Sequence, residues 1–203
     1  MNGSRITGDE ASRISLTIGV VVAVVLVGAV GYFVFTAFST VKGMVGFDPN
    51  RPIPSDDVLK ARLTKEQYHV VREGGTETPF HNAYFNNERA GIYVDIITGE
   101  PLFVSFDKID TQTGQLAFTK PISKDLLVEK PDFSHDMQRT EVRVKRSDAH
   151  LGHVFDDASS GTGRRYSVNS AALRFIPTEK LTAEGYGAYL ALVEQKTVVE
   201  QKK

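Results

Sequence analysis

The sequence of 203 residues contains no cysteine and no tryptophan. A chain without cysteine cannot form a disulfide, hold zinc through thiolates, attack a substrate with a thiol or pass through a sulfenic acid. It also has no excess of charge, since 24 lysines and arginines stand against 25 aspartates and glutamates. The composition therefore disfavours nucleic-acid binding, which needs a basic surface. It does not decide between a reducing and an oxidising compartment.

One long apolar run lies near the N-terminus. Residues 16–38 read LTIGVVVAVVLVGAVGYFVFTAF without a charge, and about 20 apolar residues suffice to cross a bilayer. The apolar part of a cleaved signal peptide is shorter, about 7 to 15 residues. We therefore predict an N-terminal tail over 1–15 and a transmembrane helix over 16–38 that has the lipid bilayer as its partner.

The charges around this run favour one orientation. Arg13 and the free amino terminus precede the apolar run, and basic residues tend to stay on the cytoplasmic side. We expect the N-terminus in the cytoplasm and the rest of the chain outside it, in the periplasm. Residues 39–55 follow with Pro49, Pro52 and Pro54, and proline favours an extended, stiff chain. This stretch is predicted to be a linker.

Residues 56–194 have the pattern of a mainly antiparallel β domain with small flanking helices. Short apolar runs such as GIYVDII, PLFVSF and TEVRVKR are separated by glycine, proline, asparagine and aspartate, as is typical of strands joined by turns. Helical spacing of apolar residues predicts one short helix over 56–68 and a closing helix over 178–194. The polar end, 195–203, is expected to be a frayed tail.

Three strings resemble one known family. EVRVKRSDAHLGHVFDDASSGTGRRYSVNSAALRFIP, at 141–177, resembles the C-terminal motif of the methionine-R-sulfoxide reductases. LTKEQYHVVREGGTETPF, which begins at Leu63, is similar to the family's opening, and TGQLAFTKPI, which begins at Thr113, is similar to its central loop. The strings follow the family order, which makes chance agreement remote. The resemblance implies a compact, twisted antiparallel β architecture with small helices outside.

The family's nucleophile is replaced in this chain. The resemblance places a cysteine or selenocysteine at the position that is Ser167 here. Reduction of the family type needs a thiolate or selenolate that attacks the sulfoxide sulfur and becomes a sulfenic or selenenic acid. A serine hydroxyl has no such state, so Ser167 leaves no catalytic residue and we expect the chain not to be an enzyme.

The resemblance also concerns metal binding. Zinc-binding members carry two C-x-x-C pairs, and the matching positions here are Asp95, Thr98, Val144 and Ser147. Structural zinc needs four ligands, mostly thiolate or imidazole. We therefore predict no zinc and no other cofactor.

The positions of the family's substrate pocket are only partly retained. Gln115 stands where the family usually has a tryptophan that forms an apolar wall. The polar positions that match could bind a sulfoxide by hydrogen bonds, or could satisfy one another within a β core, which we favour. The predicted vestigial pocket consists of Gln115, Phe118, His150, His153, Arg165, Ser167 and Asn169.

These features predict a non-catalytic, membrane-anchored structural or binding subunit of a larger membrane complex, respiratory, photosynthetic or transport, built on a degenerate reductase domain. Its partners would be other proteins of that complex. The alternatives are a membrane-tethered peptide-methionine (R)-S-oxide reductase and a methionine-sulfoxide-binding protein.

Two further interpretations rank lower. Ser167 with His150 or His153 and Asp156 could form a hydrolase triad, but the flanking glycines of a nucleophile elbow are missing. Asp95 with Glu100, or Asp156 with Asp157, could suggest calcium, but no acidic run has the spacing of a calcium loop.

Overall fold

The computed structural model describes residues 46–194. The predicted tail, the predicted transmembrane helix at 16–38 and the final residues 195–203 lie outside this part. Within residues 46–194, no helix is both long and apolar enough to cross a membrane. The membrane span and the periplasmic location stay predictions.

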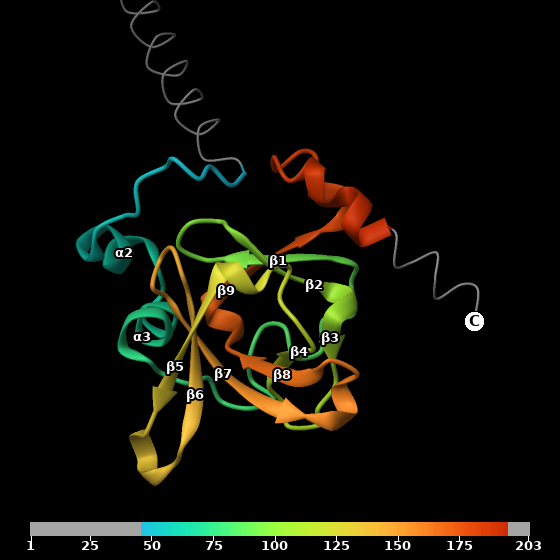
Figure 1. The fold of residues 1–203 in the computed structure, drawn as a ribbon. Helices are drawn as coiled ribbons and strands as arrows, with labels where there is room; N and C mark the ends of the chain where they lie inside the picture. Colours follow the sequence, from blue (N-terminus) through green and yellow to red (C-terminus); the bar gives the residue numbers. More distant parts are fainter. Residues whose placement is uncertain (1–45, 195–203) are drawn as a thin grey trace, which may run out of the picture. The chain divides into compact units, whose positions relative to one another are not determined.

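Two antiparallel sheets form the domain, which confirms the mainly antiparallel β prediction (Figure 1). The smaller sheet has the order β2-β1-β9 and consists of β1 (Gly91–Asp95), β2 (Pro101–Val104) and β9 (Leu173–Pro177). The larger has the order β3-β4-β8-β7-β6-β5. Its strands are β3 (Lys108–Ile109), β4 (Leu116–Phe118), β5 (Leu127–Asp132), β6 (Arg139–Val144), β7 (His150–Asp157) and β8 (Gly163–Val168).

Short 3-10 turns connect the strands. They are η1 (Ser105–Asp107), η2 (Lys124–Leu126), η3 (Ser134–Asp136), η4 (Ala158–Ser160) and η5 (Ser170–Ala172).

Two helices stand where one was predicted. α2 (Asp56–Arg62) ends at Leu63, which is extended, and α3 (Lys65–Glu73) begins after Thr64. The Thr64 side chain accepts a hydrogen bond from the Gln67 backbone, and the Gln67 side chain accepts one from the Thr64 backbone. This capping box satisfies donors at the start of α3, so it begins a new helix inside the apolar pattern.

The strand β1 is buried on both faces, since it lies between two hydrophobic clusters. Tyr93 belongs to the larger cluster, with residues of the six-stranded sheet, α2 and α3. Ile92 and Val94 belong to a smaller cluster with residues of the C-terminal segment. That segment is not the single helix predicted over 178–194: it contains η6 (Thr178–Lys180), η7 (Gly187–Tyr189) and a helical stretch at 190–194.

A β-bulge in β7 places two histidines on the same face. Val142 of β6 pairs with Gly152, whereas the next residue, Arg143, pairs with His150, so Leu151 is the extra residue. The Leu151 side chain is fully buried in the core. The His150 and His153 rings lie 5.6 Å apart, centroid to centroid. Three-residue spacing would place them on opposite faces of a regular strand, so the bulge creates this pair.

Hydrogen bonds connect the positions predicted to match the family's zinc ligands. Asp95 accepts bonds from the Ile97 backbone (3.2 Å), the Thr98 backbone (3.1 Å) and the Thr98 hydroxyl (2.6 Å). It is also hydrogen-bonded to Ser147, which lies just before β7. These bonds hold the β1–β2 turn to the β6–β7 turn. The fourth position, Val144, lies in the hydrophobic core.

The bulge depends on glycine, and substitution of Gly152 should destabilise the fold. Gly152 has φ +148°, and a Cβ atom there would lie 2.2 Å from the Ser167 carbonyl oxygen. We expect Gly152→Ala to lower the free energy of unfolding by about 3 kcal/mol. Gly161→Ala is the control, since Gly161 also has positive φ but open space around it, and should lose only about 1 kcal/mol. Urea denaturation measures both, and equal losses would contradict the role of the contact.

Glu100 should make stability depend on pH. It is 8% exposed, its Oε2 atom is buried without a hydrogen-bond partner among the described residues, and burial and the Asp95 carboxylate raise its pKa. Because the pKa of Glu100 is higher in the folded state, protonation of this side chain stabilises the fold. That contribution is complete below the unfolded pKa and is lost as the pH rises through the folded pKa.

We therefore expect Glu100→Gln to match the wild type in stability at pH 4 and to exceed it at pH 7. Urea denaturation at the two pH values measures the difference. Glu88→Gln, at an exposed glutamate, is the control and should show no such trend. A variant less stable than the wild type at pH 7 would contradict this expectation.

Candidate functional site

Ser167 lies in a row of side chains that crosses the six-stranded sheet. It pairs with Ala117 of β4 on one side and with His153 of β7 on the other, and His153 pairs with Glu141 of β6. Directly opposed residues project from the same face of a sheet. Ser167 is half-buried, whereas its neighbours along β8, Tyr166 and Val168, lie in the core. The row therefore occupies the face of the sheet opposite the main core.

Each histidine of this face is held by a carboxylate. His150 Nδ1 lies 2.7 Å from Glu141 Oε1, and His153 Nε2 lies 2.7 Å from Asp132 Oδ2. Arg143 and Arg139 complete the two groups, at 2.7 Å from Glu141 Oε1 and 2.8 Å from Asp132 Oδ2 respectively. The β5–β6 hairpin thus provides both carboxylates and both guanidinium groups.

The charges of these groups follow from their contacts. Burial would raise the pKa of Glu141, but hydrogen bonds from His150 and Arg143 outweigh it and lower the pKa. Hydrogen bonds from Ser134 and His153 hold the pKa of Asp132 well below its usual range. Both carboxylates are therefore ionised at neutral pH.

His150 has one ring nitrogen available. Burial lowers its pKa, so the ring is neutral at pH 7. Nδ1 must carry the proton, because the ionised Glu141 can only accept a hydrogen bond. Nε2 is buried and has no hydrogen-bond partner within residues 46–194. An unpartnered buried polar atom is costly, so this nitrogen is a candidate contact for a ligand.

Asn169 and Gln115 belong to a second network, centred on Glu77. Asn169 Oδ1 accepts from the Glu77 backbone (3.0 Å), and Asn169 Nδ2 donates to the Leu151 carbonyl (3.0 Å). Gln115 Nε2 donates to the Glu77 carbonyl (3.1 Å). The buried Glu77 carboxylate accepts from the backbone amides of Ser170 and Ala171. This network joins the end of β8 to the loop before β4.

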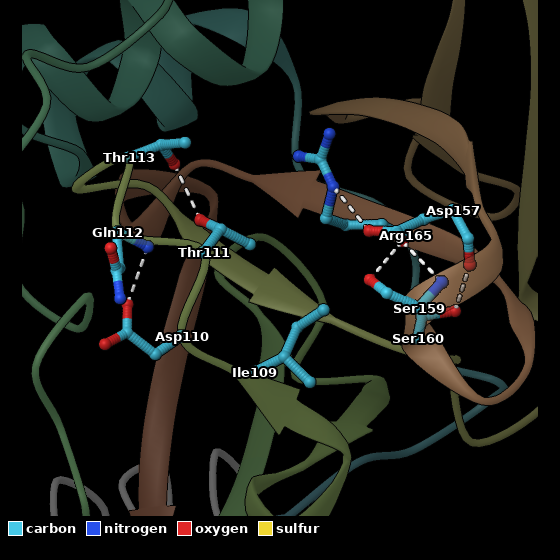
Figure 2. A pocket seen from close by; sticks show the side chains of 9 residues that line it. All are labelled: Ile109, Asp110, Thr111, Gln112, Thr113, Asp157, Ser159, Ser160 and Arg165. Carbon is cyan, nitrogen blue, oxygen red and sulfur yellow. Dashed lines mark hydrogen bonds and ion pairs between the residues drawn. The ribbon is translucent and has the colours of Figure 1, made fainter.

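Arg165 borders a pocket of about 450 Å³, shown in Figure 2. Its Nε donates to Asp157 Oδ2 (3.2 Å), and its guanidinium lies 4.8 Å from the centre of the Phe155 ring. The terminal guanidinium nitrogens make no hydrogen bond to the described residues. The facing wall carries the hydroxyls of Thr111 and Thr113, 2.7 Å apart. The full lining is Ile109, Asp110, Thr111, Gln112, Thr113, Asp157, Ser159, Ser160 and Arg165.

The structure divides the predicted pocket residues into three groups. Ser167, His150 and His153 share the site face with Arg165, which lies two residues from Ser167 on β8. Asn169 and Gln115 are engaged in the Glu77 network. Phe118 lies in the hydrophobic core and stacks on Phe103, with ring centroids 4.5 Å apart.

A hydrolase triad is not assembled. The Ser167 hydroxyl makes no hydrogen bond to either histidine within the described part of the chain, and the predicted acid, Asp156, has a side chain that is 97% exposed, while His153 pairs with Asp132. The face instead offers the Arg165 guanidinium as a donor for an acceptor oxygen, and His150 Nε2 becomes a second donor when the ring is protonated. A sulfoxide oxygen is such an acceptor.

Sequence reasoning missed Asp132, Glu141 and Glu77. Their roles depend on strand register, which places Glu141 opposite His153, and on the long-range approach of Glu77 to η5. The alternation of TEVRV does put Glu141 and Arg143 on one face, and this signal could have suggested a charged row beside the histidines.

Comparisons with known proteins find one family and one similar relative. The SelR domain family matches residues 63–177. A relative from Vibrio cholerae, named peptide methionine sulfoxide reductase MsrA/MsrB, is 53% identical over 139 residues. The match covers 68% of this chain and only 37% of the relative, so the chain spans well under half of that protein's length.

These findings correct the predicted function. The expectation of a non-catalytic subunit of a membrane complex, and of a pseudoenzyme, is wrong, because a relative at 53% identity is named as a reductase. Neither the comparisons nor residues 46–194 support a membrane-complex subunit. The physical reason lies in the site: His150 and Arg165 do not merely satisfy their neighbours, since each keeps nitrogen atoms without a partner among the described residues. The missing cysteine removes one covalent step but leaves these groups in place.

The matched region extends from Leu63, just before α3, to the end of β9 and includes both histidines, Arg165 and Ser167. On this evidence the chain belongs to the SelR domain family of methionine-R-sulfoxide reductases.

Proposed function

We propose that this chain reduces methionine-R-sulfoxide, with the two electrons supplied by two external thiol groups. The observation that carries the proposal is the 53% identity to a protein named as a peptide methionine sulfoxide reductase. The unpartnered Nε2 atom of His150, on the same face as Ser167, supports it.

The reaction balances without a thiol in the chain. One sulfoxide and two thiol groups give one sulfide, one disulfide and one water. The first thiolate attacks the sulfoxide sulfur while the oxygen takes up protons and leaves as water. The second thiolate then attacks the sulfur of the first, the disulfide forms, and the electron pair of the broken bond returns to the sulfide.

The residues of the site bind the substrate and move protons. Protonated His150 donates from Nε2 to the sulfoxide oxygen, and Glu141 stabilises the positive ring through Nδ1. Arg165 offers a second donor to the developing charge on oxygen. Ser167 has a small side chain, which leaves room for the external thiolate to reach the sulfoxide sulfur. Its hydroxyl can donate a further hydrogen bond to the sulfoxide oxygen. Activity is thus limited by a thiol that must diffuse in.

Turnover of the full chain tests this function. We expect N-acetyl-methionine-R-sulfoxide to be reduced in the presence of dithiothreitol faster than by dithiothreitol alone, measured as sulfide by chromatography. We expect Ser167→Cys to raise the rate by about a hundredfold or more, because a fixed thiol replaces a diffusing one.

The matched control is Ser55→Cys, at an exposed serine whose side chain makes no capping bond. It should behave as the wild type. A wild-type rate equal to the thiol background would overturn the proposed function, even if Ser167→Cys were active. Binding of the sulfoxide without turnover would identify a sulfoxide-binding protein instead.

The affinity for sulfoxide should increase as the pH is lowered below 7. A sulfoxide oxygen only accepts hydrogen bonds, and His150 Nε2 can donate only when the ring is protonated, which burial opposes by lowering the pKa. Above that pKa, affinity should fall by up to about tenfold per pH unit. Calorimetric titration at pH 5 to 8 measures this dependence.

His150→Asn should abolish the pH dependence. His69→Asn, at an exposed histidine that pairs with Glu73, should retain it. An affinity that does not change with pH in the wild type would exclude a protonated His150 as the donor.

A further inference from the structure

The turn at Phe80 has an unfavourable backbone for its residue. The His81 backbone amide donates to the Thr78 carbonyl (3.2 Å), which closes a four-residue turn with Pro79 and Phe80 at its centre. Phe80 has φ +63°. A turn with proline second and positive φ third usually has glycine at the third position. A bulky residue there is a genuine outlier, and such outliers collect at functional sites.

The Phe80 ring gains little burial in return. Phe80 is 55% exposed, and it meets the edge of the Phe85 ring at a centroid distance of 5.8 Å. An aromatic ring in solvent on a strained backbone adds little to the stability of the fold. A contact with a ligand would explain why the ring is there.

The strained turn is fixed firmly to the site. The Phe80 backbone amide and Asn82 Nδ2 both donate to the Gly114 carbonyl, at 2.9 Å and 2.7 Å. Asn82 Oδ1 accepts from the Ser170 hydroxyl (2.7 Å). A Cβ atom on Gly114 would lie 2.5 Å from the Phe80 ring, so the ring covers this glycine directly.

Gly114 lies between two parts of the site. Thr113 before it lines the pocket beside Arg165, and Gln115 after it bonds to Glu77. The lining of that pocket is polar except for Ile109 (Figure 2). Methionine sulfoxide has a polar S–O group and an aliphatic chain, so a site for it needs an apolar face as well as donors.

We propose that Phe80, supported by Phe85, is the apolar subsite that contacts the aliphatic chain of the sulfoxide substrate. This inference rests on the proposed function, because that function defines the ligand. Phe80 then determines specificity, since it distinguishes a methionine side chain from smaller sulfoxides. The Phe80 ring is exposed to solvent because the backbone of its turn fixes it in that position.

Two probes and two variants of the full chain test the role of Phe80. The probes are N-acetyl-methionine-R-sulfoxide and dimethyl sulfoxide, which has the same S–O group without the chain. We expect Phe80→Gly to weaken binding of the first probe about five- to tenfold, the order of one aromatic contact, and that of the second less than about twofold. Phe80→Gly should also raise Tm by about 2 to 4 °C, because glycine relieves the strain.

Phe133→Ala is the matched control, because Phe133 is 68% exposed and has an ordinary φ of −109°. It should bind both probes as the wild type does. Unchanged binding of the first probe by Phe80→Gly, equal weakening of both probes, or a lower Tm would each overturn the inference. The last result would show that the ring only stabilises the fold.

The outcomes separate the inference from the proposed function. If the wild type reduces the sulfoxide and Phe80→Gly binds it equally well, the inference alone fails. If the wild type binds the sulfoxide without reducing it, the proposed function fails, and the inference is decided by the two probes. If the wild type binds neither probe, both are overturned.

Discussion

The close approach of β7 and β8 at Gly152 is the constraint on which the site depends. Gly152 leaves no room for a side chain against the Ser167 carbonyl, and the bulge beside it moves His150 to the face that carries His153. Without that bulge, one histidine would point into the core that Leu151 now fills. The position of Ser167, the histidine pair and the packing of β7 therefore follow from one backbone feature.

The two sides of the site differ in how their charged groups are arranged. Asp132 and Glu141 on the β5–β6 hairpin are ionised, and each holds one histidine and one arginine. On the other side, Arg165 pairs with Asp157, the loop at 109–113 contributes Asp110 and two threonine hydroxyls, and the Phe80 turn contributes one exposed aromatic ring. Both sides of the Ser167 strand therefore carry polar groups, and the exposed Phe80 ring lies on only one of them.

Much of the fold could be predicted from the sequence, because the strand pattern is local and the family motifs are clear. The division into α2 and α3 was missed, since the apolar spacing continues through Leu63 and only the Thr64 capping box reveals the break. The closing helix was overestimated because Gly185, with φ +82°, interrupts its pattern.

The site was predicted less completely than the fold. His150, His153 and Arg165 were found through their resemblance to the family, but their partners depend on register and on contacts far apart in the sequence. Glu77 meets Ser170 across 93 positions, and no local pattern predicts that. Phe118 was assigned to the pocket because the motif contains it, whereas the pleat of β4 turns it into the core.

A serine at position 167 also changes how the site would fare under oxidative stress. A thiolate there could be driven beyond the sulfenic state to sulfinic and sulfonic acids, which the thiols of the cell do not reverse. A hydroxyl has no such series of oxidised states. If the reducing thiol comes from solution, peroxide oxidises that small molecule, which can be replaced. Position 167 of the protein is then not oxidised.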